Sequence, residues 1–107
     1  MIDKIYNYTL TENKTIEKVV SDEVAMINHM ILPKGDCLPT HYANSNVYMI
    51  VANGAVTLEL DENPPETYAK GSIINITYGT LMSVCNTNDE ILELFVIKAP
   101  GPAYYNK

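Results

Sequence analysis

The chain of 107 residues carries a formal net charge of −6, and 47% of its residues are hydrophobic and 19% charged. This length suits one domain, and the apolar content supports a packed core rather than disorder. All seven basic residues are lysine, and an acidic chain without arginine is a poor candidate for binding nucleic acid, whose phosphates require clustered positive charge. No apolar run approaches the roughly 18–20 residues that span a bilayer, and the polar N-terminus lacks a signal-peptide pattern, so we expect a cytoplasmic protein without a membrane partner.

Short apolar or alternating segments, separated by turn-forming residues, predict an all-β fold. In chain order these segments are 23–32, 47–52, 55–60, 72–76, 81–86 and 90–97. The stretch VYMIVANGAVTLEL (47–60) predicts a β-hairpin, because Asn53-Gly54 suits a type I′ turn. The tail, 100–107, is expected to be irregular, since its prolines cannot serve a central strand.

From Ile91 onward, the predicted strand 90–97 is apolar on both faces apart from Glu93. One face carries Ile91, Phe95 and Ile97, and the other carries Leu92, Leu94 and Val96. An antiparallel strand of a lone small barrel normally has one solvated face, so we expect a second copy of the chain to cover the outer one in a homodimer. Glu93 either points inward, where a carboxylate needs a partner or a ligand, or outward at the dimer edge.

Two blocks of glycine-spaced sequence stand out. In the first, Gly35 is followed by five residues and His41, and Gly54 closes the block. In the second, Gly71 is followed by five residues, Thr77, Tyr78-Gly79, two residues, Met82, three residues and Asn86. Glycine recurring at fixed places reflects backbone positions that other residues adopt poorly.

This spacing resembles the two motifs of small single-domain cupins, a family of jelly-roll barrels. The first family motif runs G, five residues, H-x-H, three or four residues, E, six residues, G, and the second runs G, five residues, P-x-G, two residues, H, three residues, N. The chain keeps both spacings across roughly residues 25–99. The resemblance implies a cupin-type jelly-roll barrel of antiparallel strands, one domain over 1–107, with an N-terminal strand segment over 1–24.

Most of the residues that bind a metal in the family are absent from this chain. Its two histidines, its glutamate and the histidine of its second motif fall on His41, Ala43, Val47 and Met82. Alanine and valine cannot ligate a metal, and a thioether is a poor ligand for Fe(II), Mn(II) or Zn(II). We therefore expect no metal cofactor. A residual site would use His41 and Met82, with a soft ion such as Cu(I) also reaching Met49 or Met30, although methionine more simply fills gaps in a core.

Strand alternation predicts which side chains line the barrel interior. Positions 41, 43, 47, 49 and 51 share one face, and 82, 84 and 86 share another. The expected pocket is therefore largely apolar and is lined by His41, Ala43, Val47, Met49, Val51, Met82, Val84 and Asn86. Asn44, Asn46 and Glu93 are expected at a polar rim, although Asx turns explain the two asparagines equally well.

Three functions fit these residues. Concave, mostly apolar barrel mouths suit small molecules, so the leading hypothesis is a small-molecule-binding cupin without the usual metal. The first alternative is a metal-independent isomerase, epimerase or lyase in which His41 is the catalytic acid or base. It needs a second proton carrier, for which Tyr42, Tyr48, Tyr78 and Glu93 are the candidates. The second alternative is a protein-interaction or assembly module, which predicts a barrel filled by its own side chains.

Two further features receive structural interpretations. Cys37 and Cys85 lie 48 positions apart without a C-x-x-C motif, so in a cytosolic setting we expect two free thiols. His29 alternates with Met26, Asn28 and Met30 and is expected on the outside of the barrel or at the dimer seam, without a function.

Overall fold

The computed structural model describes residues 4–106. Within this range the chain forms nine strands and one short 3₁₀ helix. The elements are β1 (Thr15–Ser21), β2 (Met26–Leu32), β3 (His41–Tyr42), β4 (Val47–Asn53), β5 (Ala55–Leu60), β6 (Glu66–Ala69), β7 (Ile73–Ile76), β8 (Leu81–Cys85), β9 (Leu92–Lys98) and η1 (Pro102–Asn106).

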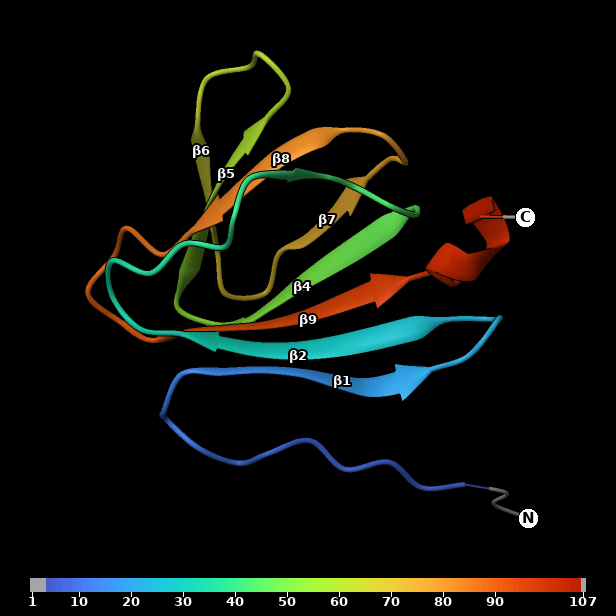
Figure 1. Ribbon diagram of the computed structural model, residues 1–107. Coiled ribbons are helices and arrows are strands. Elements are labelled where there is room, and N and C mark those ends of the chain that lie inside the picture. The colour runs from blue at the N-terminus through green and yellow to red at the C-terminus, as the bar shows by residue number, and fades with distance from the viewer. Residues whose placement is uncertain (1–3, 107) are drawn as a thin grey trace.

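The strands form two sheets that face one another (Figure 1). One sheet has five strands in the order β1-β2-β9-β4-β7, and the other has four in the order β3-β8-β5-β6. Every strand pairing is antiparallel. This arrangement confirms the predicted all-β fold of antiparallel strands.

The core lies between the two sheets, where every second side chain of each strand points inward. Its largest fully buried apolar members are Leu32, Val47, Met49, Val51, Val56, Leu58, Ile76, Val84, Leu92 and Leu94. Removing such side chains from water is the main favourable term in folding, worth about 1.5–3 kcal/mol for each large aliphatic residue. The same alternation leaves Phe95 and Ile97 on the outer face of β9.

The predicted hairpin over residues 47–60 is wrong. β4 pairs with β7 and β9 in one sheet, whereas β5 pairs with β6 and β8 in the other, so the chain changes sheet at Gly54. Gly54 has a φ of 73°, and a Cβ built there would lie 2.5 Å from the carbonyl oxygen of Ile91. Glycine is therefore required both by the backbone conformation and by this close approach. Asn53 keeps a negative φ, which a type I′ turn does not allow.

The chain ends also differ from expectation. The predicted N-terminal strand segment, 1–24, contains β1, and residues 4–14 before it form no strand, while residues 1–3 lie outside the described range. The tail predicted to be irregular forms η1, and its residue 107 again lies outside that range. The described part of the chain contains no helix long and apolar enough to cross a membrane.

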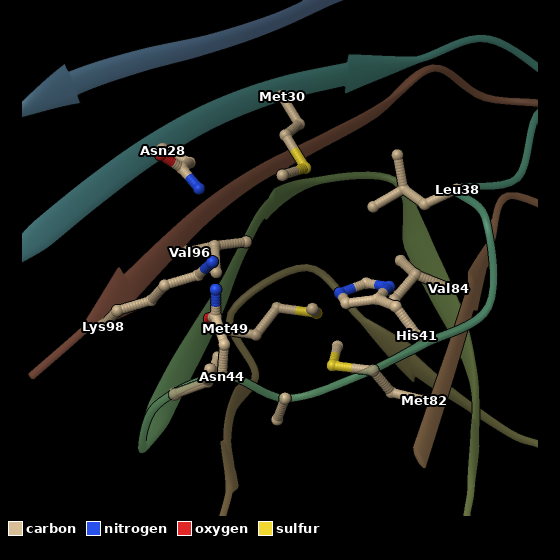
Figure 2. Close-up of a pocket in the computed structure, with 12 residues that line it drawn as sticks. Asn28, Met30, Leu38, His41, Asn44, Met49, Met82, Val84, Val96 and Lys98 are labelled. Atoms are coloured by element: carbon tan, nitrogen blue, oxygen red, sulfur yellow. The ribbon is translucent and has the colours of Figure 1, made fainter. Parts of the chain in front are cut away.

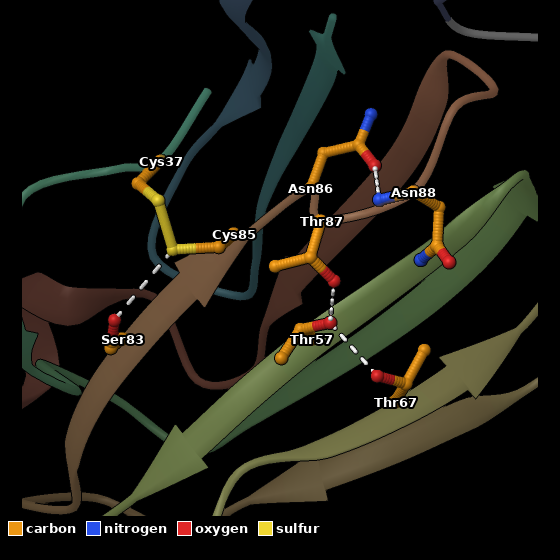
Figure 3. The surroundings of a disulfide bond; sticks show 8 residues. All are labelled: Cys37, Thr57, Thr67, Ser83, Cys85, Asn86, Thr87 and Asn88. Atoms are coloured by element: carbon orange, nitrogen blue, oxygen red, sulfur yellow. Dashed lines mark hydrogen bonds between the residues drawn. A yellow bond between two sulfur atoms is a disulfide. The ribbon is translucent and has the colours of Figure 1, made fainter. Parts of the chain in front are cut away.

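Cys37 and Cys85 form a disulfide, so the expectation of two free thiols is wrong (Figure 3). The bond joins the loop before β3 to the end of β8, where the two residues also form an isolated antiparallel bridge. Sequence separation alone did not reveal that these distant positions meet across a sheet edge. Disulfides persist mainly in oxidising compartments, and the cytoplasmic location stays a prediction.

We predict that reduction of this disulfide lowers the free energy of unfolding by about 2–4 kcal/mol, because the bond closes a long loop in the unfolded chain. The measurement is urea unfolding followed by tyrosine fluorescence, with and without reductant, together with the Cys37→Ser/Cys85→Ser double variant. The double variant should match the reduced protein and be insensitive to reductant. Alkylation of both thiols in the folded, unreduced protein would contradict the bond itself.

Candidate functional site

A cavity of about 50 Å³ lies between the two sheets (Figure 2). The structure places six of the eight predicted lining residues around it: His41, Ala43, Val47, Met49, Met82 and Val84. Asn44, predicted at the rim, also lies on its wall. The lining that sequence reasoning did not include consists of Asn28, Met30, Leu38, Val96 and Lys98.

Val51 and Asn86, which were expected to line this pocket, do not. Val51 points inward but lies further along β4, where it is buried in the core. Asn86 follows the end of β8, and its amide turns toward the backbone. Its Nδ2 donates to the carbonyl oxygens of Leu32 and Glu90, each at 2.9 Å, and its Oδ1 accepts from the N–H of Asn88 at 3.0 Å (Figure 3). Asn86 therefore holds loops together and offers nothing to a ligand.

His41 is held by its own loop. Its Nδ1–H donates to the carbonyl oxygen of Pro39 at 2.8 Å, which orients the ring so that it projects into the cavity (Figure 2). In a neutral ring with this tautomer, Nε2 carries no proton and acts as an acceptor. The neighbouring strand pairing, His41 opposite Met82, places a thioether beside the imidazole.

The proton carrier that an acid–base role for His41 requires is missing from the described residues. None of their tyrosines or carboxylates forms a hydrogen bond with its ring. Tyr42, Tyr48 and Tyr78 are all exposed, and the first two alternate with inward-facing neighbours along β3 and β4. Strand alternation explains why residues next to the pocket in sequence point away from it.

The donor set does not fit the metals of the cupin family. The four motif positions supply one imidazole, two hydrocarbon side chains and one thioether. Among the described residues, no group of three or more His, Cys, Asp or Glu side chains is placed to hold a metal ion. Met30, Met49 and Met82 line the cavity together with His41, and this soft set would suit only an ion such as Cu(I).

The polar end of the cavity was missed by sequence reasoning. Figure 2 shows Asn28, Asn44 and Lys98 at one end, and His41 with Met82 at the other. Lys98 follows Leu92, Leu94 and Val96 in the inward-facing series of β9. Its inward position could therefore have been predicted from the sequence by extending the two-residue alternation past Val96.

The Asn28 amide is left without a partner. Its side chain is only 8% exposed, and its Oδ1 is fully buried with no hydrogen bond to any described residue. Leaving a buried polar group unsatisfied costs about 1–3 kcal/mol. An amide oxygen only accepts, so a water molecule or another N–H or O–H donor is needed to satisfy it.

Lys98 is partly buried at the same end of the cavity. Burial lowers the pKa of its ammonium group, and the charge of Lys18 lowers it further. No carboxylate among the described residues forms an ion pair with Lys98, in contrast to Lys14 and Lys34, which pair with Asp36 and Asp89. The cavity thus has one end of hydrogen-bond donors and positive charge in an otherwise acidic protein.

Glu93 and Asn46 do not lie at the rim of this cavity. Glu93 points to the outer face of the five-stranded sheet, because its neighbours Leu92 and Leu94 point inward. Asn46 is tied to the backbone and to Asn75, whose Nδ2 donates to Asn46 Oδ1 at 3.0 Å. Neither residue lies at the rim of this cavity, and of the two orientations considered for Glu93 the outward one holds.

On the outer face, His29 is fully buried between two carboxylates. Its Nδ1 lies 2.8 Å from Glu17 and its Nε2 lies 2.7 Å from Glu93. Each ring nitrogen of His29 therefore lies within hydrogen-bond distance of a carboxylate oxygen. The backbone N–H of Thr9, followed by His29, lowers the pKa of Glu17. Tyr8 packs on the His29 ring, so this cluster anchors the N-terminal segment to the sheet.

Comparison with known proteins places the chain in a family. No family model matches it. It is 40% identical to the uncharacterised protein MJ0764 of Methanocaldococcus jannaschii over 107 residues, which cover 99% of this chain and 92% of that protein. The crystal structure of MJ0764, described as an RmlC-like cupin family protein with a double-stranded β-helix fold, superposes with a TM-score of 0.95 over 100% of this chain and 99% of the other. The chain belongs to the RmlC-like cupin family.

More distant structures share the fold. An uncharacterised conserved protein of Klebsiella pneumoniae with a double-stranded β-helix domain is 14% identical, with a TM-score of 0.75 over 90% of this chain and 80% of that one. A cupin superfamily protein of Desulfitobacterium hafniense is 5% identical, with a TM-score of 0.73 over 87% and 83%. At such low identity these similarities show the fold alone, so the function must be argued from the site.

We predict that Asn86→Asp lowers the free energy of unfolding by about 3 kcal/mol and Asn86→Ala by about 2 kcal/mol. Both changes remove the two donors to backbone carbonyls, and aspartate also sets a carboxylate against those oxygens. Urea unfolding measures the loss. Asn63→Asp is the matched control, because its exposed amide donates to a single carbonyl, that of Leu60, and we expect a change within about 0.5 kcal/mol. An equally small effect at Asn86 would contradict its structural role.

Proposed function

We propose that this cupin binds a small molecule in the cavity between its sheets without the metal that its family uses. One observation supports the proposal above others: an apolar cavity ends in a buried amide and an ammonium group that have no hydrogen-bond or ion-pair partner among the described residues. Binding sites combine mostly apolar walls with a few convergent polar groups that orient the ligand.

The size of the cavity limits the ligand. Pockets for drug-sized ligands measure about 300–1,000 Å³, whereas this cavity measures about 50 Å³. The ligand is therefore a molecule of few non-hydrogen atoms. Met30, Met49 and Met82 line the cavity and can rotate to admit a somewhat larger one, since methionine side chains are unbranched and flexible.

The two alternatives receive less support. An assembly module predicts a barrel filled by its own side chains, and a cavity with unpartnered polar groups argues against it. A metal-independent isomerase, epimerase or lyase draws support from the His41 ring, which projects into the cavity (Figure 2). It lacks a second proton carrier hydrogen-bonded to that ring among the described residues, so binding without chemistry fits the site better.

The homodimer is a separate proposal. On the outer face of β4 and β7, Tyr48 and Ile73 are 42% and 66% exposed, and Ile50 lies opposite Ile73. The N-terminal segment covers the neighbouring part of the sheet through Tyr8, which contacts Phe95. A second copy of the chain would cover the apolar surface that this segment leaves open.

To test ligand binding, we would record methyl spectra of methionine-labelled protein during titration with acetate, propionate, acetamide, isopropanol and imidazole. We expect at least one probe to shift the signals of Met30, Met49 and Met82, because these three methionines line the cavity. Ala43→Leu adds three carbon atoms to the cavity wall and should abolish the shifts. Ala69→Leu makes the same change at an exposed position of β6 and should preserve them.

Two results would contradict this proposal. The first is the absence of any saturable shift with all five probes. The second is near-stoichiometric metal, measured by elemental analysis after exposure to Fe(II), Mn(II), Zn(II), Ni(II) and Cu(I), that disappears in His41→Ala. The second result would direct attention to the imidazole and the thioethers around it.

For the homodimer, light scattering after size exclusion should give about twice the chain mass of 11.9 kDa. We expect Ile73→Asp to shift the protein toward a monomer, because it places a carboxylate in the proposed interface. Val24→Asp, at an exposed apolar residue in the turn between β1 and β2, should leave the mass unchanged. A wild-type mass equal to one chain would rule the dimer out.

A further inference from the structure

The polar end of the cavity has a charge that nothing in the described chain neutralises. The protein has 13 acidic residues, yet none of those described forms an ion pair with Lys98. Lys34, by contrast, lies 2.7 Å from Asp89. Lys18, whose charge acts on Lys98, stands opposite Asn28 in the pairing of β1 with β2 and adds to the positive potential. A partly buried cation of this kind favours an anionic ligand.

The groups around Lys98 supply hydrogen-bond donors. In the pairing of β2 with β9, Asn28 stands opposite Val96, and Met26 stands opposite Lys98, so Asn28 and Lys98 are diagonal neighbours on one face. Figure 2 shows the Asn28 side-chain nitrogen directed into the cavity. The ammonium of Lys98 has three donors, enough to serve the unpartnered Asn28 Oδ1 and an anion together. Asn44 adds a further amide at the same end.

The other walls restrict which anion fits. Met30, Met49 and Val96 offer no hydrogen bonds of ordinary strength, so an anion that is polar all round, such as a phosphate or a sugar acid, would leave its oxygens unsatisfied there. A water molecule requires about 10–15 Å³ of such space, so 50 Å³ holds a chain of about three to five atoms. A single ammonium matches a single negative charge.

We propose, on the basis of the small-molecule function proposed above, that the ligand is a short-chain monocarboxylate. Its carboxylate lies against Lys98, Asn28 and Asn44, and its hydrocarbon tail of about one or two carbon atoms, or three where a methionine rotates, lies among the methionines. The Lys98 ammonium neutralises the charge, and the Asn28 side-chain nitrogen, which is directed into the cavity, donates to the carboxylate. The Asn28 Oδ1 only accepts, so its hydrogen bond comes from the Lys98 ammonium.

The test compares charged and neutral probes of the same shape. Methionine-methyl spectra are recorded during titration with propionate and butyrate and, in parallel, with propionamide and butyramide. In the wild type, we expect saturable shifts of Met30 and Met49 with dissociation constants at least about tenfold lower for the carboxylates, as a charge-assisted hydrogen bond predicts. Lys98→Met should remove this preference while the amides still bind.

Two further variants test whether the preference for carboxylates depends on the charge of Lys98. Lys98→Gln retains a polar side chain at the site and should also remove the preference, which keeps the test informative if the methionine variant folds poorly. Lys70→Met removes a lysine from an exposed position after β6 and should leave all affinities within about twofold.

The outcomes separate the two proposals. If carboxylates and amides bind equally in the wild type and in both Lys98 variants, the assignment of a carboxylate ligand is overturned and small-molecule binding stands. If no probe gives a saturable shift, both proposals fail. If the preference persists in both Lys98 variants and is lost in Lys70→Met, the anion site lies elsewhere and the assignment is again overturned.

Discussion

The two-residue alternation of β9, at the centre of the five-stranded sheet, determines what happens on both faces of this molecule. The strand pairs with β2 on one side and β4 on the other, so its side chains have no freedom to change face without breaking two ladders. Leu92, Leu94 and Val96 thereby enter the core, and Lys98 reaches the cavity. The intervening Glu93 necessarily faces outward, where it meets His29.

The framework residues of the two cupin motifs are held by contacts within the chain itself. Gly54 is held by a close backbone approach and a positive φ, and neither depends on any ligand in the cavity. Asn86 is held by bonds to loop carbonyls. These motif residues serve the barrel. At three of the positions that carry metal ligands in the family, this chain has Ala43, Val47 and Met82, and all three are buried in the core.

Periodicity and turn residues in the sequence were enough to predict most strands and the inward face of the strand around Val47 and Met49, because these are local properties. Partner choice is not local, so the same reasoning wrongly joined β4 to β5 across Asn53-Gly54 and missed the Cys37–Cys85 bond. It also assigned Asn86 to the pocket by counting every second residue from Met82, although β8 ends at Cys85. The two-residue alternation of side chains holds only within a strand.

The unpartnered polar groups of this cavity lie outside the positions that define the family motifs. The motif supplies His41 at one end, whereas the unpartnered groups Asn28 and Lys98 stand on β2 and β9 at the other, outside both motifs. A partly buried ammonium without a counter-ion is unfavourable, and an anion that binds beside it offsets part of this cost. The anion site that we propose therefore lies at this cationic end, whereas the motif positions place His41 at the other end of the cavity.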